Sequence, residues 1–288
     1  MLQPLEPRRL LSVSATFENG VITVMGTPTA DQITVSTGPP GGWSIKSGEA
    51  FVPVETGEEQ VVGIMVMGGG RDDVISVDLE ADDIDVSLYG HSGNDTISVN
   101  THGAASVDVY GGHGAVTIAA DYFGPGSSGG TIDGMWANDV ITVRSGVGSY
   151  APRVYGGSGD DVIRATTQLH SATGQAVWGG PGNDAITLAN VDLAVPVTNV
   201  ARGEAGNDYI TGSDGRDLLF GDEGNDMIRG GAGDDVIFGG AGNDRMYGHA
   251  GDDYFDGGLG KDRISGEDGY DFALEDKLDD VAGVELLI

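Results

Sequence analysis

The feature that most constrains this chain is a nine-residue repeat in its last third. Aligned on Gly-x-x-Gly-(Asn/Asp)-Asp-x-apolar-x, eight units follow without a gap from Gly203 to the unit that begins at Gly266. Their sixth residues are all aspartate: Asp208, Asp217, Asp226, Asp235, Asp244, Asp253, Asp262 and Asp271. A glycine-rich acidic linker is the alternative, but a linker needs no register, so the period argues for stacked structural units.

The same turn recurs more slowly upstream, about every 22 residues. Units that begin at Gly68, Gly90, Gly111, Gly134, Gly156 and Gly179 place Asp73, Asp95, Val116, Asp139, Asp161 and Asp184 at the sixth position. Asp31 stands about two such steps before Asp73. Short strands flank each turn, as in "VSLYG" and "DTISV", which predicts two strands per coil.

These two spacings predict an all-β fold. We expect a parallel β-helix with coils of about 22 residues that continues into a C-terminal parallel β-roll, with two nonapeptides in each coil of 18 residues. The predicted segments are an N-terminal sorting or disordered segment at 1–15, an irregular parallel β-helix at 16–202, the β-roll at 203–274, and a C-terminal cap or secretion signal at 275–288.

The predicted β-roll has a small apolar core and a high negative charge, so it needs a further stabilising interaction. Each nonapeptide offers one inward apolar residue: Ile210, Leu219, Ile228, Ile237, Met246, Phe255, Ile264 and Ala273. Residues 203–288 carry 22 acidic and 6 basic side chains, against 23 and 8 in residues 1–202. A net charge of −31 disfavours nucleic acid and anionic lipid as partners and favours cations. No apolar stretch is long enough to span a membrane.

The turns supply oxygen ligands for those cations. Glycines at positions 1, 2 and 4 are expected to reach φ > 0 and to turn carbonyl oxygens inward, while the sixth-position carboxylate closes the turn. Hard oxygen ligands without cysteine favour several Ca²⁺ ions over Mg²⁺. Besides the eight aspartates above, the candidate ligands are Asp161, Asp184, Gly206, Gly215, Gly224, Gly233, Gly242 and Gly251.

The register also predicts two rows of aspartates. One holds Asp208, Asp226, Asp244 and Asp262, and the other holds Asp217, Asp235, Asp253 and Asp271. The first row should continue upstream through Asp184, Asp161 and Asp139, break at Val116, and resume at Asp95 and Asp73. An upstream aspartate could hold an ion or cap its turn by accepting backbone N–H bonds, and both interpretations stay open.

The units "GGAGDDVIF" and "GGAGNDRMY" resemble the repeats-in-toxin (RTX) family, whose repeat is G-G-x-G-x-D-x-U-x. The last unit, "GEDGYDFAL", departs from it at Ala273. The resemblance implies a calcium-binding roll that stays unfolded in the cytosol and folds outside the cell after type I secretion. The N-terminal "LQPLEPRRLLS" resembles the LEPR-x-L-L motif of secreted bacterial proteins, so we expect an extracellular or cell-surface location.

The function predicted from these patterns is a monomeric, secreted, calcium-binding structural or adhesive module without an enzyme activity of its own. Outward aromatic residues before the turns could stack on one another or bind a surface glycan or the extracellular matrix: Tyr89, Tyr110, Tyr155, Trp178, Phe220 and Phe238. The alternative is a polysaccharide-modifying epimerase or lyase. Its site would be built from Tyr89, His91, Asp95, Tyr110 and His113.

Overall fold

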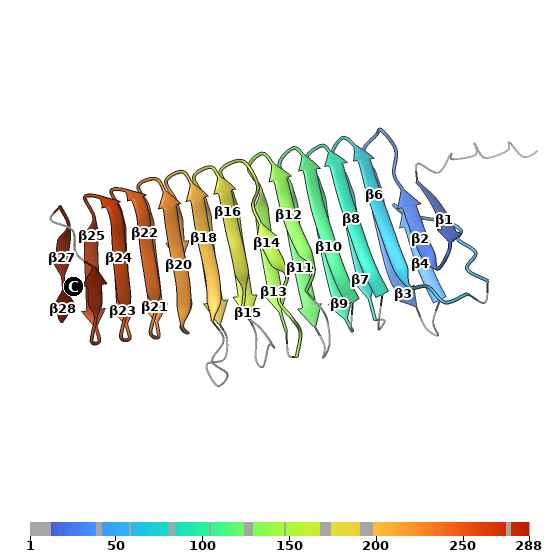
Figure 1. Ribbon diagram of the computed structural model, residues 1–288. Helices are drawn as coiled ribbons and strands as arrows, with labels where there is room; N and C mark the ends of the chain where they lie inside the picture. Colours follow the sequence, from blue (N-terminus) through green and yellow to red (C-terminus); the bar gives the residue numbers. More distant parts are fainter. Residues whose placement is uncertain are drawn as a thin grey trace, which may run out of the picture.

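The chain folds as a parallel β-solenoid whose coils stack along one axis into a rod (Figure 1). The computed structural model describes residues 13–38, 42–57, 59–80, 84–103, 105–123, 129–146, 148–167, 174–190, 198–274 and 278–287. All regular elements in these ranges are β-strands. The all-β solenoid predicted from the repeat is therefore confirmed.

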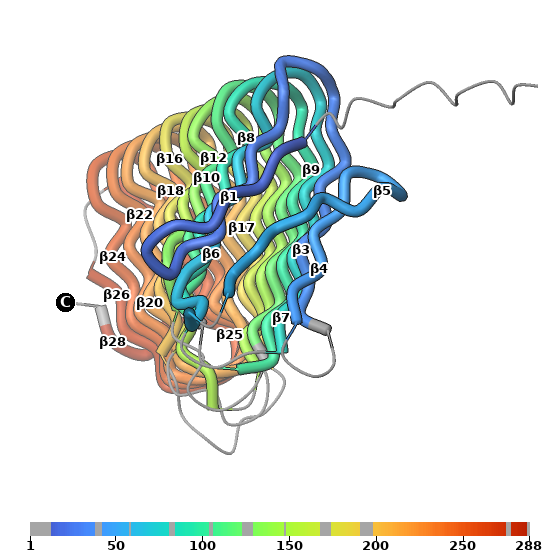
Figure 2. Tube along the Cα trace, turned by 90° about the vertical axis from the view of Figure 1, so that its right-hand side faces the viewer, coloured from blue at the N-terminus to red at the C-terminus, as the bar shows by residue number. Residues whose placement is uncertain are grey.

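The strands form two sheets of fourteen strands each, which face one another across a narrow core (Figure 2). Sheet A contains, in spatial order, β1 (Ser14–Glu18), β2 (Val21–Met25), β6 (Gly63–Gly70), β8 (Ile84–Ser92), β10 (Ala105–His113), β12 (Thr131–Trp136), β14 (Arg153–Tyr155), β16 (Ala176–Pro181), β18 (Asn199–Ala205), β20 (Asp217–Glu223), β22 (Val236–Gly242), β24 (Tyr254–Gly260), β26 (Phe272–Leu274) and β28 (Leu286–Leu287). Sheet B contains, from the same end, β5 (Ala50–Phe51), β4 (Gly42–Ser47), β3 (Gln32–Gly38), β7 (Val74–Leu79), β9 (Thr96–His102), β11 (Thr117–Phe123), β13 (Val140–Ser145), β15 (Val162–Thr167), β17 (Ala185–Asn190), β19 (Tyr209–Thr211), β21 (Met227–Ala232), β23 (Arg245–Ala250), β25 (Arg263–Asp268) and β27 (Asp280–Ala282).

Between Val74 and Arg263 the coil length changes once along the rod. In sheet B, Val74 lies beside Thr96, and partners on adjacent strands stay about 22 residues apart as far as the pair Ala185 and Tyr209. From Tyr209 to Arg263 each coil contains only two nonapeptides, as between Tyr209 and Met227. Both spacings agree with the steps in the sequence, because every coil in this part of the rod adds one parallel strand to each sheet.

Strand alternation builds the core. The eight predicted inward residues of the nonapeptides are all buried, with 0% exposure. Adjacent residues take opposite faces, so Ile141 is buried while its neighbour Val140 is 40% exposed. Longer strands bury a second side chain, as β9 does with Ile97 and Val99, whereas β19 buries Ile210 alone. The core is therefore wider in the long coils than in the short ones.

The N-terminal end of the rod differs from the prediction. Asp31 does not stand two coils before Asp73, because β3 pairs directly with β7 and a single, much longer coil connects Gln32 to Val74. The extra length forms β4 and β5, which run antiparallel to β3 and β4, and β1 runs antiparallel to β2. These hairpins cover the edges of the first coil, where parallel strands would otherwise end unpaired.

Some predicted features lie outside the described ranges. The LEPR-x-L-L segment falls within residues 1–12, and residues 275–277 and 288 of the predicted C-terminal segment are also outside. Where that segment is described, β27 pairs with β25, and β28 pairs with β26. Within the described ranges, no helix has the length and apolar character needed to cross a membrane.

Candidate metal centre

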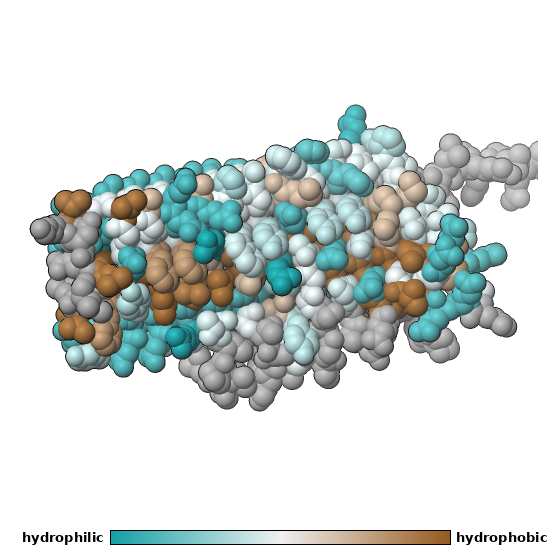
Figure 3. All heavy atoms as spheres, in the orientation of Figure 1, coloured by the Kyte–Doolittle hydropathy of each residue, from teal (hydrophilic) through white to brown (hydrophobic). Residues whose placement is uncertain are grey.

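Sixth-position aspartates line the two edges of the rod where the chain passes between the sheets. The first row follows the sheet A strands that lead into sheet B, and the second row follows the return into sheet A. The first row contains Asp31, Asp73, Asp95, Asp139, Asp161, Asp184, Asp208, Asp226, Asp244 and Asp262. The second row contains Asp217, Asp235, Asp253 and Asp271. All are at most 3% exposed, although the surface of the turns around them is polar (Figure 3).

One oxygen of each carboxylate ties neighbouring coils together. The backbone N–H of Asp208 donates to Oδ1 of Asp226 at 2.8 Å, and that of Asp226 donates to Oδ1 of Asp244 at 2.8 Å. The second row repeats the contact between Asp235 and Asp253 at 2.8 Å. The same bond links the upstream residues, with Asp161 donating to Asp184 at 2.8 Å. Each bond thus caps one turn with the aspartate of the next coil.

The other oxygen lacks a donor in most turns. Oδ2 is buried without a hydrogen-bond partner in Asp73, Asp139, Asp161, Asp184, Asp208, Asp226, Asp235, Asp244, Asp253 and Asp271. A buried carboxylate oxygen without a donor or a cation is costly, because the charge has lost its water. These oxygens therefore mark positions where the fold leaves a negative charge uncompensated by its own groups.

A backbone carbonyl lies beside this oxygen. A Cβ atom placed on Gly221 would overlap both Oδ2 of Asp226 and the carbonyl oxygen of Gly239 on the next coil. The upstream turn at Gly156 shows the same convergence of Oδ2 of Asp161 with the carbonyl of the following coil. A carboxylate oxygen and a carbonyl oxygen thus converge at the first position of turns such as these, where only glycine leaves room.

This geometry corrects the predicted roles of the glycines. First-position glycines such as Gly221 do not adopt positive φ; they are required for space. Position 4 does adopt it, with φ of 143° at Gly224, and the carbonyl of Gly206 approaches Gly224 so closely that a Cβ would overlap it. The second position tolerates side chains at positive φ, as at Asp222.

The predicted ligand list therefore missed part of the oxygen set. The fourth-position glycines lie on the Oδ1 side of the carboxylate, where a Cβ placed on Gly224 would be 3.2 Å from Oδ1 of Asp226. The first-position carbonyls lie beside Oδ2. The recurrence of glycine at position 1 in every nonapeptide was the signal that could have identified them.

Burial raises the pKa of the carboxyls whose Oδ2 lacks a donor. Loss of hydration is the largest cause throughout, partly opposed by the N–H bond to the neighbouring coil, and it lifts the pKa of Asp226 and Asp208 to about 6 and that of Asp244 to about 7. The pKa of Asp235 rises to about 9, because the charges of Asp217, Asp253 and Asp234 add to its burial. Asp235 therefore combines burial with repulsion from three neighbouring carboxylates.

Asp217 differs from the other predicted ligands. Its Oδ1 accepts from Nδ2 of Asn199 at 2.7 Å, and its Oδ2 accepts from the hydroxyl of Ser213 at 2.9 Å. Both oxygens are thus bonded by the protein itself. Asp217 begins the second row, and the position preceding it in that row is occupied by Asn199, whose side-chain amide donates to Oδ1 of Asp217.

Val116 breaks the first row in the way the sequence predicts. Its N–H still donates to Oδ1 of Asp139 at 2.7 Å. A Cβ on Gly111 would lie 2.7 Å from Cγ1 of Val116 and 2.5 Å from the carbonyl oxygen of Gly134. A methyl group thus occupies the place that Oδ2 holds in the other turns, so this turn lacks the charged oxygen.

The alternatives for the upstream aspartates do not exclude one another. Asp161 and Asp184 cap a neighbouring turn with Oδ1 and keep Oδ2 unbonded, as Asp226 does in the strict repeats. A carboxylate has enough acceptor sites for both roles. The geometry of the first row is therefore continuous across the change in coil length.

A second ladder at the fifth position escaped the sequence prediction. The backbone N–H and the side-chain amide of Asn225 both donate to Oδ1 of Asn207, at 2.8 and 3.0 Å, and Asn243 repeats this with Asn225. These bonds run from each coil to the preceding one, opposite to the aspartate bonds. The preference for Asn or Asp at position 5 was visible in the repeat, but the direction of the hydrogen bonds that these side chains make depends on the fold.

The chemistry of this oxygen set fits a hard cation. No group of three or more His, Cys, Asp or Glu side chains gathers as a metal site in the part of the chain that is described. An ion at these turns would have to be held by single carboxylates and backbone carbonyls. Ca²⁺ accepts both ligand types in flexible geometry, whereas Mg²⁺ requires a stricter octahedron.

The predicted outward aromatic row does stack. Tyr89 and Tyr110 lie 5.2 Å apart, Tyr155 and Trp178 4.8 Å apart, and Phe220 and Phe238 5.0 Å apart, between ring centroids and nearly parallel. The row is interrupted where Asp133, Arg202 and Asp256 take the aromatic position. Arg202 nevertheless covers the ring of Phe220 at 4.3 Å.

The residues of the alternative enzyme site are only partly brought together. Tyr89, His91, Tyr110 and His113 line one shallow pocket with Gly112, Met135 and Trp136. Asp95 lies inside the turn, where Oδ1 accepts the N–H of Asp73 at 2.8 Å. The lining of the pocket thus consists of aromatic, histidine, glycine and methionine residues.

Comparison with known proteins agrees with the geometry of the turns. A search of curated proteins finds no match to this chain. A family model for the RTX calcium-binding nonapeptide repeat matches four times, at residues 153–167, 198–228, 220–255 and 238–273. The matches include Asp161 and the rows from Asp208 to Asp271. The chain therefore carries RTX calcium-binding nonapeptide repeats over about a third of its length, and these repeats imply Ca²⁺ binding.

Proposed function

We propose that this chain is a secreted structural module that folds when Ca²⁺ binds to its two aspartate rows outside the cell. The observation that carries the proposal is the repeated buried Oδ2 without a donor, next to a backbone carbonyl of the following coil. Binding of a cation at this point offsets the uncompensated charge, so binding free energy contributes to folding free energy.

The ligands of these turns support an extracellular location. Each turn offers one carboxylate, and the remaining ligands are neutral carbonyls. Calcium affinity rises with the number of charged ligands, and weak extracellular sites have dissociation constants on the order of 10⁻⁴–10⁻³ M. Sites of this kind stay empty at cytosolic Ca²⁺ concentrations and fill outside the cell. The nonapeptide repeats after residue 203 would then remain extended during export and fold afterwards.

A Ca²⁺ titration of the full chain, followed by far-UV circular dichroism, tests the proposal. We expect the β-sheet signal to increase with a midpoint in the high micromolar to millimolar range. Asp235→Ala combined with Asp253→Ala should move the midpoint to higher Ca²⁺. Asp121→Ala is the matched control, because Asp121 lies outside both rows and only pairs with Arg144 at the surface.

Two results would contradict the proposal. A full sheet signal in metal-free buffer would show that the fold does not need the ion. A midpoint below one micromolar would allow folding in the cytosol, and the export mechanism would then be wrong even if calcium binds.

A further inference from the structure

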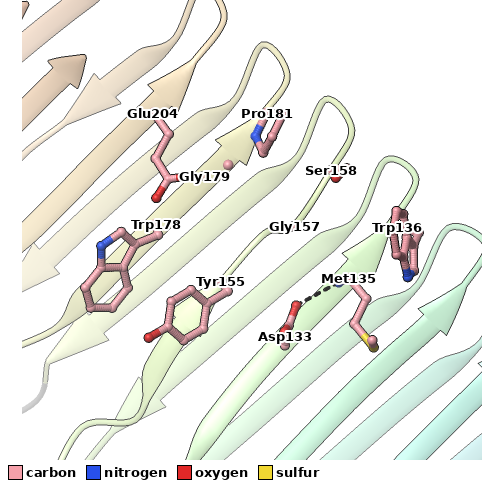
Figure 4. Close-up of a pocket in the computed structure, with 11 residues that line it drawn as sticks. Asp133, Met135, Trp136, Tyr155, Gly157, Ser158, Trp178, Gly179, Pro181 and Glu204 are labelled. Carbon is pink, nitrogen blue, oxygen red and sulfur yellow. Dashed lines mark hydrogen bonds between the residues drawn. The ribbon is translucent and has the colours of Figure 1, made fainter. Parts of the chain in front are cut away.

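A groove crosses the outer face of sheet A over coils that belong to the upstream part of the rod. Figure 4 shows the residues around it, with Tyr155 and Trp178 on one side and Trp136 standing at the turn. Its volume is about 350 Å³, within the range of small-ligand sites. The calcium rows do not use these side chains, so the groove needs a separate explanation.

The hollow originates in the second position of four successive turns. Met135, Gly157, Gly180 and Glu204 occupy this position on adjacent coils. Met135 and Glu204 carry side chains at positive φ, 76° and 78°, a conformation that side chains disfavour. The two glycines between them leave a bare backbone floor. The two side chains therefore define the ends of a depression two coils wide.

A flat slot lies within this groove. Trp136, Ser158 and Pro181 follow one another on three coils at the third position of the turn. One face of the Trp136 ring stacks on His113, with centroids 5.6 Å apart, and the other faces Ser158. Trp136 and Pro181 are two strand spacings apart, roughly 9.6 Å. One saturated ring fits between them, since each contact needs about 3.5–4 Å.

The groove presents polar groups suited to hydroxyls. Asp133 and Glu204 lie in its lining, and the Tyr155 hydroxyl and Trp178 indole N–H belong to its aromatic side. Because Tyr155 and Trp178 stack face to face, 14° from parallel, they turn their edges outward. Aromatic edges carry the positive part of the ring quadrupole, which favours hydroxyl oxygens and disfavours cations.

Charge excludes anionic ligands. The lining contains two carboxylates, Asp133 and Glu204, and no basic residue, and the chain carries a net charge of −31. The groove is also continuous with the neighbouring pocket, because Met135 and Trp136 line both. A ligand longer than one ring can therefore extend along the rod towards Tyr110 and Tyr89.

From this geometry we infer that the groove between Trp136 and Glu204 binds a neutral oligosaccharide, with one pyranose ring held between Trp136 and Pro181. Trp136, 51% exposed, supplies the stacking face, and Asp133 and Glu204 accept hydrogen bonds from sugar hydroxyls. This inference goes beyond calcium-dependent folding, since it assigns a ligand to a surface that the ion rows do not touch.

The test is a titration of the full chain, in saturating Ca²⁺, with a gluco-pentaose, a manno-pentaose, an oligogalacturonate of equal length and choline. Isothermal calorimetry and indole fluorescence report binding. We expect at least one neutral pentaose to bind, and Trp136→Ala and Glu204→Gln to weaken it tenfold or more. Ser158→Trp should abolish binding by filling the slot while Trp136, Asp133 and Glu204 are kept.

The matched control is Tyr247→Ala, which removes an aromatic residue from β23 on the opposite sheet. The calcium-induced circular dichroism transition, measured on the same samples, separates a lost groove from a lost fold. The inference is overturned if neither neutral pentaose binds, if the oligogalacturonate or choline binds more tightly, or if Tyr247→Ala weakens binding as much as Ser158→Trp.

Discussion

The long coils of residues 63–202 and the short coils of residues 203–274 share one turn geometry and differ in their cores. Asp161 and Asp226 bind their neighbours through Oδ1 and leave Oδ2 unbonded in the same way. The long coils, however, bury pairs such as Ile97 and Val99 on one strand, whereas the short coils bury a single residue. One aspartate row therefore runs through two regions whose cores differ in width.

The two regions also differ in their density of negative charge. Residues 203–288 hold a net charge of −16, nearly the same as the −15 spread over the first 202 residues. Among the described residues, the second aspartate row lies in the short coils, where Asp234 and Asp252 add charge beside it. Less apolar burial and more repulsion act on the same coils. We therefore expect calcium to matter most after residue 203.

The largest expected effect is regional unfolding on calcium removal. When the full chain is stripped of Ca²⁺, the amide protons of β19 to β26 should exchange within seconds, while those of β7 to β13 stay protected. Hydrogen exchange read by mass spectrometry measures both regions in one sample. Equal loss of protection in both would show that the rod unfolds as a unit and that core width does not separate the regions.

Core substitutions should affect the long coils and the short coils differently when Ca²⁺ is absent. In Ca²⁺, Ile141→Ala and Ile228→Ala each remove a fully buried side chain and should cost about 2–5 kcal/mol. Without Ca²⁺, Ile141→Ala should still lower the melting temperature, whereas Ile228→Ala should have no effect, because its coil is already unfolded. Thermal melts followed by circular dichroism provide the comparison, and a persistent effect of Ile228→Ala in metal-free buffer would contradict it.

The pH dependence of folding stability should reverse when Ca²⁺ is bound. Burial raises the pKa of Asp184, Asp244 and Asp253 to about 7 from 3.8. Without Ca²⁺ the folded state therefore gains stability below about pH 4 and loses it as the pH rises through 7. With Ca²⁺ the ion needs ionised carboxylates, so affinity should fall roughly tenfold per site between pH 8 and pH 6.

Melting temperatures at pH 5 and pH 8 test this reversal, with metal removed by a chelating resin instead of a pH-sensitive chelator. The metal-free protein should melt higher at pH 5, and the calcium-loaded protein should melt higher at pH 8. If both forms showed the same trend, protons and calcium would not compete for these carboxylates.

The smallest effect is expected from repairing the break in the first row. Val116→Asp places a carboxylate where Cγ1 now lies beside the carbonyl of Gly134. The variant should bind about one additional ion, measured by equilibrium dialysis. Val116→Asn is the matched control, since asparagine has the shape of aspartate without its charge. An unchanged ion count in Val116→Asp would indicate that the long coils use their aspartates only as turn caps.

The sequence alone determined the repeat, the two coil lengths and the rows of buried aspartates. Spacing carries this information because a parallel solenoid places residues one period apart directly beside each other, as Asp208 and Asp226 are. Strand alternation similarly identified Ile210 and its equivalents as core residues. In a fold built from nearest-neighbour contacts, local rules are enough to place these groups.

Only the tertiary structure decided how the two oxygens of each carboxylate are used. Oδ1 meets an N–H and Oδ2 meets a carbonyl of another coil, so their roles depend on stacking and on the direction of each coil. The same holds for Asp217, which accepts hydrogen bonds from Ser213 and Asn199, and for the hairpins that lengthen the coil after Asp31. Contacts between coils set these features, and a repeat spacing does not encode the side chains that break its own pattern.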